Sequence, residues 1–194
     1  MEAADKAGDG QGYLRNQFLV AMPSLSDEQF GQTVTLLCEH NDEGALGLVV
    51  NRPTDLKLAD MLSHLGLDTS HFSEAGPPVF WGGPVQPERG FVVHTEAGNW
   101  DATLTISDTL HLTTSRDILD ALAAGSGPSH YIVLLGYAGW DAGQLESEIL
   151  HNAWLNTPVD QQILFDTPSS DRWQAATRLL GVDFTQLTSA AGHA

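Results

Sequence analysis

The chain has 194 residues, of which 25 are acidic and 8 are basic, so its formal net charge is −17. Its hydrophobic content of 42% excludes disorder of the whole chain, and its single cysteine excludes an internal disulfide. No apolar stretch approaches the ~20 residues that span a bilayer, and no basic cluster suits phosphate binding. We therefore expect a cytoplasmic protein that contacts neither membranes nor nucleic acid directly.

The N-terminal third of the chain predicts a β-hairpin. Residues 1–12 lack an apolar period and are expected to form a mobile tail. A first strand is predicted at 18–22, followed by a short helical turn that Ser26 caps. Val34–Cys38 and Leu46–Asn51 are rich in β-branched and aliphatic residues and flank a polar, glycine-containing turn, which is typical of a hairpin.

The middle of the chain predicts one helix and three strands. Apolar residues in 56–65 recur on one helical face, which indicates a helix. Strands are predicted at 79–81, 91–95 and 103–113, the last from its alternating apolar residues. The glycines and prolines that bound residues 77–113 allow a β-rich subdomain there.

The C-terminal part predicts helices and strands in alternation. A helix is expected at 116–124. A central strand that is covered on both faces is expected at 131–135, and a glycine-rich turn is expected to follow it. A second helix is predicted at 143–154, a last strand at 161–165 and a last helix at 172–180.

The order of these elements predicts the fold class. Strands come first in hairpin order and helices are interspersed without regular alternation, which argues for an α/β (α+β) fold. We expect a mixed, largely antiparallel sheet with helices packed on it. No internal repeat or linker divides the body, so a single domain is expected over residues 13–185, followed by a tail over 186–194.

The usual catalytic and cofactor motifs are missing from the sequence. It contains no nucleophile elbow, phosphate-binding loop, dinucleotide fingerprint or zinc-protease motif, and its eight histidines lack metal-ligand spacing. We therefore expect no metal and no cofactor. Cys38, beside Glu39 and His40, is interpreted as a buried core residue rather than a nucleophile.

A first candidate segment pairs an aromatic residue with consecutive glycines. Trp81 precedes Gly82 and Gly83 between two predicted strands. Consecutive glycines expose backbone N–H groups that suit an anion or a carbonyl oxygen. The alternative interpretation is a tight turn that lets Trp81 pack.

A second candidate segment leaves the predicted central strand and enters a helix. Asp141 and Gln144 resemble a capping box at the start of this helix. The helical spacing places Glu146 among apolar residues, so we expect its carboxylate to be buried and paired with Arg52. Breaking such a pair with Glu146→Gln is expected to cost about 3–5 kcal/mol.

Several segments together resemble the YqgE/AlgH family of small bacterial proteins. The matching stretches are FLVAMP from Phe18, CEH from Cys38, GALGLVVNRP from Gly44, GGPV from Gly82, GYAGW from Gly136, GQLE from Gly143 and NAW from Asn152. The resemblance implies a cytoplasmic α/β protein with neither a known cofactor nor an established activity. It also brings the label of a transcriptional regulator of alginate production, which one branch carries. The chain lacks a helix-turn-helix pattern, so a route through a protein partner is physically easier.

We interpret the protein as a small binding or regulatory module for an unknown small molecule or protein partner. The first alternative is an unrecognised enzyme that uses Glu146 as acid or base and the Gly82 and Gly83 amides as oxyanion donors. The second is a transcriptional regulator that acts directly or through a partner. The oligomeric state stays open. The candidate ligand-binding residues are Asn51, Arg52, Trp81, Gly82, Gly83, Trp140, Gln144, Glu146 and Asn152.

Overall fold

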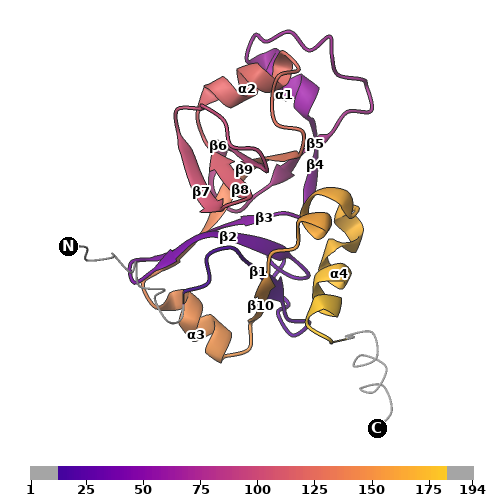
Figure 1. Cartoon of the computed structure of the whole chain (residues 1–194). Coiled ribbons are helices and arrows are strands. Elements are labelled where there is room, and N and C mark those ends of the chain that lie inside the picture. The colour runs from indigo at the N-terminus through magenta and orange to yellow at the C-terminus, as the bar shows by residue number, and fades with distance from the viewer. Residues whose placement is uncertain (1–12, 183–194) are drawn as a thin grey trace, which may run out of the picture.

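The computed structural model describes residues 13–182, which form one sheet with helices on it (Figure 1). The strands are β1 (Gln17–Ala21), β2 (Val34–Asn41), β3 (Gly44–Val49), β4 (Pro53–Lys57), β5 (Pro78–Trp81), β6 (Val85–His94), β7 (Thr103–Ser107), β8 (Leu110–Thr113), β9 (Tyr131–Asp141) and β10 (Trp154–Pro158). The helices are α1 (Leu58–His64), α2 (Arg116–Ala123), α3 (Gln144–Leu150), η1 (Gln162–Asp166), η2 (Ser169–Asp171) and α4 (Arg172–Leu179). The two predicted tails and the last residues of the predicted domain lie outside this range.

The ten strands confirm a mixed, largely antiparallel sheet. The strand order is β10-β1-β2-β3-β9-β6-β8-β7, and β4 and β5 pair beside this path. The pairing of β5 with β9 is parallel, and every other pair within the described range is antiparallel. The long strand β9 joins the two halves of the sheet, since it pairs with β6 near its start and with β3 near its end.

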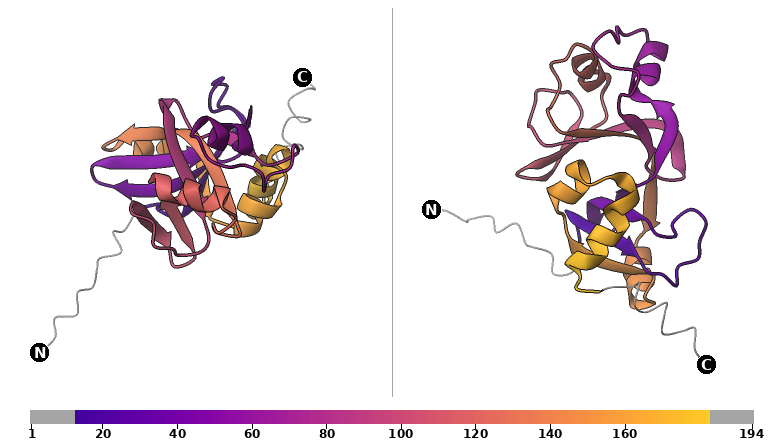
Figure 2. Two further views of the ribbon diagram at one scale, coloured as in Figure 1. Left: turned by 90° about the horizontal axis from the view of Figure 1, so that it is seen from above. Right: turned by 90° about the vertical axis from the view of Figure 1, so that its right-hand side faces the viewer.

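The helices cover the two halves of the sheet separately. α1 and α2 lie over the half that contains β5 to β8, whereas α3 and α4 lie beside β1, β2 and β10 (Figures 1 and 2). Buried aliphatic and aromatic residues form three clusters, one of which joins the two halves, since it contains Leu36 of β2 and Ile106 of β7. This burial is the main stabilising contribution to the fold.

The predicted hairpin is confirmed as β2 and β3. Leu36 pairs with Leu48, and the register shifts between Leu37 and Glu39, which places a bulge at Cys38. The Cys38 side chain is fully buried. The interpretation of Cys38 as a buried core residue is therefore confirmed.

The strand predicted at 103–113 is in fact the hairpin of β7 and β8. Its turn falls between Ser107 and Leu110, and Leu104 then pairs with Leu112. The alternation of apolar residues continues through a short turn because both strands bury the same face. Periodicity alone therefore did not reveal the turn.

The glycine-rich segment after residue 135 was also predicted wrongly. Gly136 and Gly139 lie within β9, which continues to Asp141. α3 ends at Leu150 rather than at Trp154, which instead begins β10. Because β10 pairs with β1, its existence depends on a contact far away in the sequence.

Three further element predictions need correction. The stretch predicted as a strand at 161–165 forms the π-helix η1. Leu56 belongs to β4, which the sequence analysis did not predict, so α1 begins only at Leu58. The turn before β2 is capped by Asp27 rather than Ser26, because the Asp27 carboxylate accepts the backbone N–H groups of Gln29 and Phe30.

Candidate ligand-binding site

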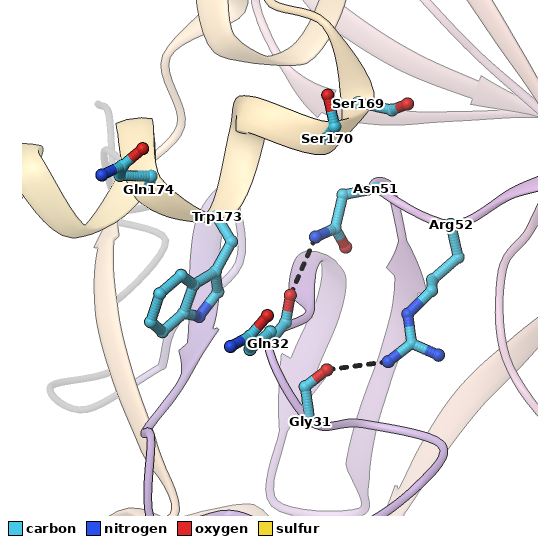
Figure 3. Close-up of a pocket in the computed structure, with 8 residues that line it drawn as sticks. All are labelled: Gly31, Gln32, Asn51, Arg52, Ser169, Ser170, Trp173 and Gln174. Carbon is cyan, nitrogen blue, oxygen red and sulfur yellow. Dashed lines mark hydrogen bonds between the residues drawn. The ribbon is translucent and has the colours of Figure 1, made fainter. Parts of the chain in front are cut away.

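A polar pocket of about 380 Å³ opens between the β3–β4 connection and the start of α4 (Figure 3). It is lined by the turn before β2, by two residues of the β3–β4 connection, and by residues of η2 and α4. The lining residues are Gly31, Gln32, Asn51, Arg52, Ser169, Ser170, Trp173 and Gln174. The pocket thus contains two of the nine residues that the sequence singled out.

The Arg52 guanidinium is the positive charge of this pocket. Its Nη2 atom donates to the Gly31 carbonyl oxygen at 2.7 Å, and Nη1 lies 3.5 Å from the Glu28 carbonyl oxygen. Neither acceptor carries a charge, and none of the eight lining residues is acidic. A guanidinium has five N–H donors, so it keeps donors for a ligand while the carbonyls hold it in place.

The Asn51 side chain holds the wall of the pocket together. Its Oδ1 atom accepts the Val34 N–H at 2.9 Å, and its Nδ2 atom donates to the Gln32 carbonyl oxygen at 2.9 Å. Gln32 has φ +56°, which is uncommon for a residue other than glycine. Because both polar ends of Asn51 are engaged, this residue shapes the pocket and leaves ligand contacts to its neighbours.

Four neutral polar side chains complete the pocket. Those of Gln32, Ser169, Ser170 and Gln174 make no hydrogen bond with any other residue in the range 13–182, and they border the same space (Figure 3). The Trp173 indole is fixed by its N–H, which donates to the Ala21 carbonyl oxygen at 2.9 Å. The pocket therefore offers a cation, hydroxyls and amides to a polar ligand.

Arg172 connects the two walls of the pocket by hydrogen bonds. The sequence analysis did not single out this residue. Its Nη1 atom donates to the Val50 carbonyl oxygen and its Nε atom to the Thr167 carbonyl oxygen at 3.0 Å. The guanidinium lies 5.2 Å from the centre of the Phe80 ring, and burial lowers its pKa to about 10. The position of Arg172 at the start of a predicted helix gave no signal that it would be buried.

The predicted Glu146–Arg52 pair is wrong, because Glu146 binds His40 and Arg52 donates to backbone carbonyl oxygens. The Glu146 carboxylate is 44% exposed and binds His40, with 2.6 Å between Oε1 and Nε2. Because His40 Nδ1 accepts the Leu14 N–H at 2.9 Å, Nε2 must carry the proton and donate to Glu146. The backbone N–H of Glu146, together with His40, lowers the pKa of this carboxyl.

Gly82 and Gly83 make a close contact between β5 and β9. The Gly82 N–H donates to the Leu135 carbonyl oxygen at 2.8 Å, so it is already engaged. A Cβ on Gly82 would lie 2.3 Å from the Gly136 carbonyl oxygen, and one on Gly83 would lie 2.1 Å from the Tyr137 carbonyl carbon. The glycines therefore serve packing, and the Gly82 amide is not free for an oxyanion.

Trp81 and Trp140 lie at the two ends of a row of aromatic rings. Neighbouring ring centres are 6.1 Å apart for Trp81 and Phe30, 5.8 Å for Phe30 and Trp154, and 6.2 Å for Trp154 and Trp140. Glu148 accepts the indole N–H groups of both Trp140 and Trp154 at 2.6 Å and 3.3 Å. The sequence analysis did not single out Glu148.

Gln144 and Asn152 occupy the two ends of α3. The Gln144 side chain accepts the Asp141 N–H at 3.0 Å, which is half of the predicted capping box. Asn152 has φ +58° just after the helix, a position that often holds a left-handed residue. Both residues are exposed and explain how the helix begins and ends.

The described residues contain neither a group of three metal-binding side chains nor a helix long and apolar enough to cross a membrane. Of the sequence-selected residues, the pocket brings together Asn51 and Arg52. The backbone N–H of Trp81 donates to the Arg52 carbonyl oxygen at 2.8 Å, which attaches the aromatic row to the same connection. Glu146, Gln144 and Asn152 belong to α3 and its ends.

Known proteins resemble this chain over nearly its whole length. A sequence model described as AlgH-like matches residues 18–185. A UPF0301 protein of Methylococcus capsulatus is 52% identical over 181 residues, covering 93% of this chain and 96% of the relative. One of Nitrosococcus oceani is 50% identical over 182 residues, with 94% and 97% covered.

Two solved structures share the arrangement of the elements. The solution structure of the AlgH protein from Pseudomonas aeruginosa has a TM-score of 0.75 at 46% identity and covers both chains completely. A crystal structure of a Corynebacterium diphtheriae protein has a TM-score of 0.68 at 23% identity, with 85% of this chain and 86% of that chain covered. The second likeness shows the fold alone.

Proposed function

The chain belongs to the AlgH-like family, and we propose that it is a binding module that holds a small anionic molecule in the pocket beside Arg52. The observation that carries the proposal is the charge of the pocket. Arg52 lines it and none of the other lining residues is acidic, although acidic residues outnumber basic ones by 25 to 8 in the chain. A guanidinium in such surroundings favours a carboxylate or a phosphate.

The contacts of the pocket also support a polar ligand. Four of the residues that line the space have hydroxyl or amide side chains without a partner inside the described chain, and each can accept or donate a hydrogen bond. Asn51 and Arg172 hold the walls by hydrogen bonds to the backbone, so the pocket is preformed. The proposal includes a cytoplasmic location and a partner other than nucleic acid.

The test is a calorimetric titration with inorganic phosphate and with citrate as probes. Gln174→Glu places a negative charge in the pocket without changing the volume of the side chain, so we expect at least tenfold weaker binding of both probes. Gln86→Glu adds the same charge on β6, outside the pocket, and is expected to bind as the unmodified protein does. Equal binding by both variants, or no binding of either probe, would contradict the proposal.

Arg52→Met provides an independent check of the cation. We expect it to abolish probe binding, whereas Arg178→Met removes an exposed cation near the end of α4 and is expected to have no effect. Mass spectrometry of the natively purified protein then identifies a co-purified anion. A neutral or cationic molecule at full occupancy would overturn the assignment.

A further inference from the structure

A second pocket, of about 180 Å³, lies between the sheet and the helices α1 and α2. Its floor includes Val92 of β6 and Val133 of β9, which are paired neighbours in the sheet. Its walls include Met61 of α1 and Leu119 of α2. The pocket is therefore mainly apolar, unlike the polar pocket beside Arg52.

Gly90 keeps the floor of this pocket open. It lies inside β6, where glycine is less stable than a residue with a side chain by about 0.5–1 kcal/mol. Its φ lies outside the left-handed region, and a Cβ there would meet no atom within 4 Å. Of the glycines in the described part of the chain, Gly90 alone combines these two properties, and it lies at the end of the register irregularity between Val85 and Gly90 in the pairing of β6 with β9. Glycine inside a strand marks a bulge, a bend or a site where a ligand approaches closely, and the pocket that Gly90 lines favours the last of these in addition to the irregularity.

The size of the pocket limits the ligand. An apolar protein cavity of about 150 Å³ stays dry and binds benzene. A pocket of about 180 Å³ therefore accepts one aromatic ring or a branched chain of similar size. Leu65 at its edge leaves 38% of its surface exposed, so the pocket opens to solvent there.

Arg116 places a positive charge on the lining of this pocket. Its Nη2 atom donates to the Leu65 carbonyl oxygen at 2.7 Å, which anchors the side chain to the end of α1. Its pairing with Asp120 is exposed and long, with 3.7 Å between Nε and Oδ1. Such surface pairs contribute little, so an incoming carboxylate can replace this one at small cost.

We propose that this pocket binds a small carboxylate whose aromatic or branched apolar body lies over Gly90 and whose charged end pairs with Arg116. The site is separate from the pocket of the proposed function and shares no residue with it. The two ligands are also distinct, because this one needs an apolar body.

The first experiment titrates the full-length protein with benzoate and isovalerate, followed by NMR. We expect dissociation constants of about 1 mM or tighter for ligands of this size, and magnetisation transfer from the ligand protons to the methyl groups of Val92 and Val133. If neither probe binds at about ten times that concentration, or if the transfer goes elsewhere, the proposal is wrong.

The second experiment fills the pocket. Gly90→Leu is expected to abolish benzoate binding without lowering the melting temperature, because the new side chain enters open space. Gly139→Leu changes an exposed glycine of β9 and is expected to leave binding intact. If Gly90→Leu still binds benzoate, the pocket is not the site.

The third experiment tests the charge. Arg116→Met is expected to weaken benzoate at least tenfold while leaving neutral benzyl alcohol unchanged, and Arg178→Met is expected to change neither. Undiminished benzoate binding by Arg116→Met would overturn the assignment of the carboxylate. Arg52→Met is expected to retain benzoate binding, so failure of the first pocket leaves this result interpretable.

Discussion

Individual side chains in this protein are held mainly by backbone atoms rather than by opposite charges. Arg52, Arg116 and Arg172 each donate to carbonyl oxygens. Asn51 contacts the backbone at both ends of its amide. Such bonds fix a residue without neutralising it, which is why Arg52 keeps a net positive charge in its pocket.

Cys38 provides a first prediction at this scale. Burial raises the pKa of its thiol, and the neighbouring Glu39 charge raises it further. Since the thiolate is the reactive form, we expect the native protein to react with Ellman's reagent far more slowly than the unfolded protein. Complete labelling of the native protein within seconds would show that the bulge in β2 opens readily.

The contact of Gly83 with β9 provides a second prediction at the scale of single residues. Gly83→Ala would place a Cβ 2.1 Å from the Tyr137 carbonyl carbon at a φ of +155°, so the backbone must shift. We expect a loss of about 3 kcal/mol in the free energy of unfolding. Gly139→Ala, whose nearest neighbour is a side-chain atom at 3.5 Å, is expected to change stability by less than about 0.5 kcal/mol in the same denaturant titration. Equal effects would mean that the strands move apart easily.

Among the elements, α3 is attached to the sheet by two carboxylates from one helical turn. Glu146 binds His40 of β2, and Glu148 accepts the indole N–H groups of Trp140 and Trp154. Leu145 is buried between them, whereas Leu150 at the end of the helix is 82% exposed. Polar contacts therefore orient a helix that buries few apolar side chains.

The attachment by Glu146 predicts a pH dependence. A carboxyl whose pKa is lower in the folded state stabilises the fold above its unfolded pKa, and this contribution is lost as the pH falls through the folded value. We therefore expect Glu146→Gln to reduce stability by less than about 1 kcal/mol at pH 7, because the pair is partly exposed. The difference should shrink as the pH falls below 4.5, the ordinary pKa of a glutamate, and should vanish below the lowered pKa of the folded state.

Denaturant titrations of the two proteins at several pH values measure this difference. Glu43→Gln, at an exposed turn, serves as the control and is expected to match the unmodified protein throughout. A loss of 3 kcal/mol or more would contradict the partly exposed pair, because losses of that size are typical of a buried ion pair.

The sequence predicted elements whose signals are local and missed those that depend on distant partners. The hairpin of β2 and β3 follows from β-branched runs around a polar turn, and α2 ends where glycines interrupt the pattern. β10 and β4 have few aliphatic residues and exist because β1 and β5 supply their hydrogen bonds. Helical arithmetic placed Glu146 in an apolar arc bounded by Leu150, but Leu150 is 82% exposed, so this side of α3 does not face the core.

The residues of the pocket were likewise predicted only where their signals are local. Asn51 and Arg52 were found because they follow a strand, and the loops at strand ends often carry binding residues. Ser169, Ser170 and Trp173 gave no signal, because only the folded chain brings α4 beside the β3–β4 connection. Glycine was informative at Gly82 and Gly83, which the sequence singled out and which pack closely against β9.

At the scale of the whole molecule, the charge argues against polyanions as partners. With a formal net charge of −17, the chain repels polyanions at long range. Its few cations are dispersed, since Arg172 is buried and both Arg52 and Arg116 are bound to carbonyl groups. No groove of phosphate-facing lysines or arginines therefore forms over the described surface.

We accordingly expect no binding to duplex DNA. Fluorescence anisotropy with a labelled duplex at about 50 mM salt is a stringent test, because low salt favours electrostatic contacts. The expected result is an unchanged anisotropy at micromolar protein. Salt-sensitive micromolar binding would contradict this prediction and would show that the lysine and arginine side chains can together contact the phosphates.

The pairing of β1 with β10 has a consequence for the order in which the protein is made. More than 130 residues separate Ala21 from its partner Trp154, so the outer edge of β1 has no neighbour until nearly the whole chain has left the ribosome. At the usual rates of synthesis this interval lasts about 7 to 27 s. During that time the nascent chain exposes an apolar strand edge to other nascent chains. We expect a ribosome-bound chain that stops before β10 to require chaperones, whereas the finished protein does not.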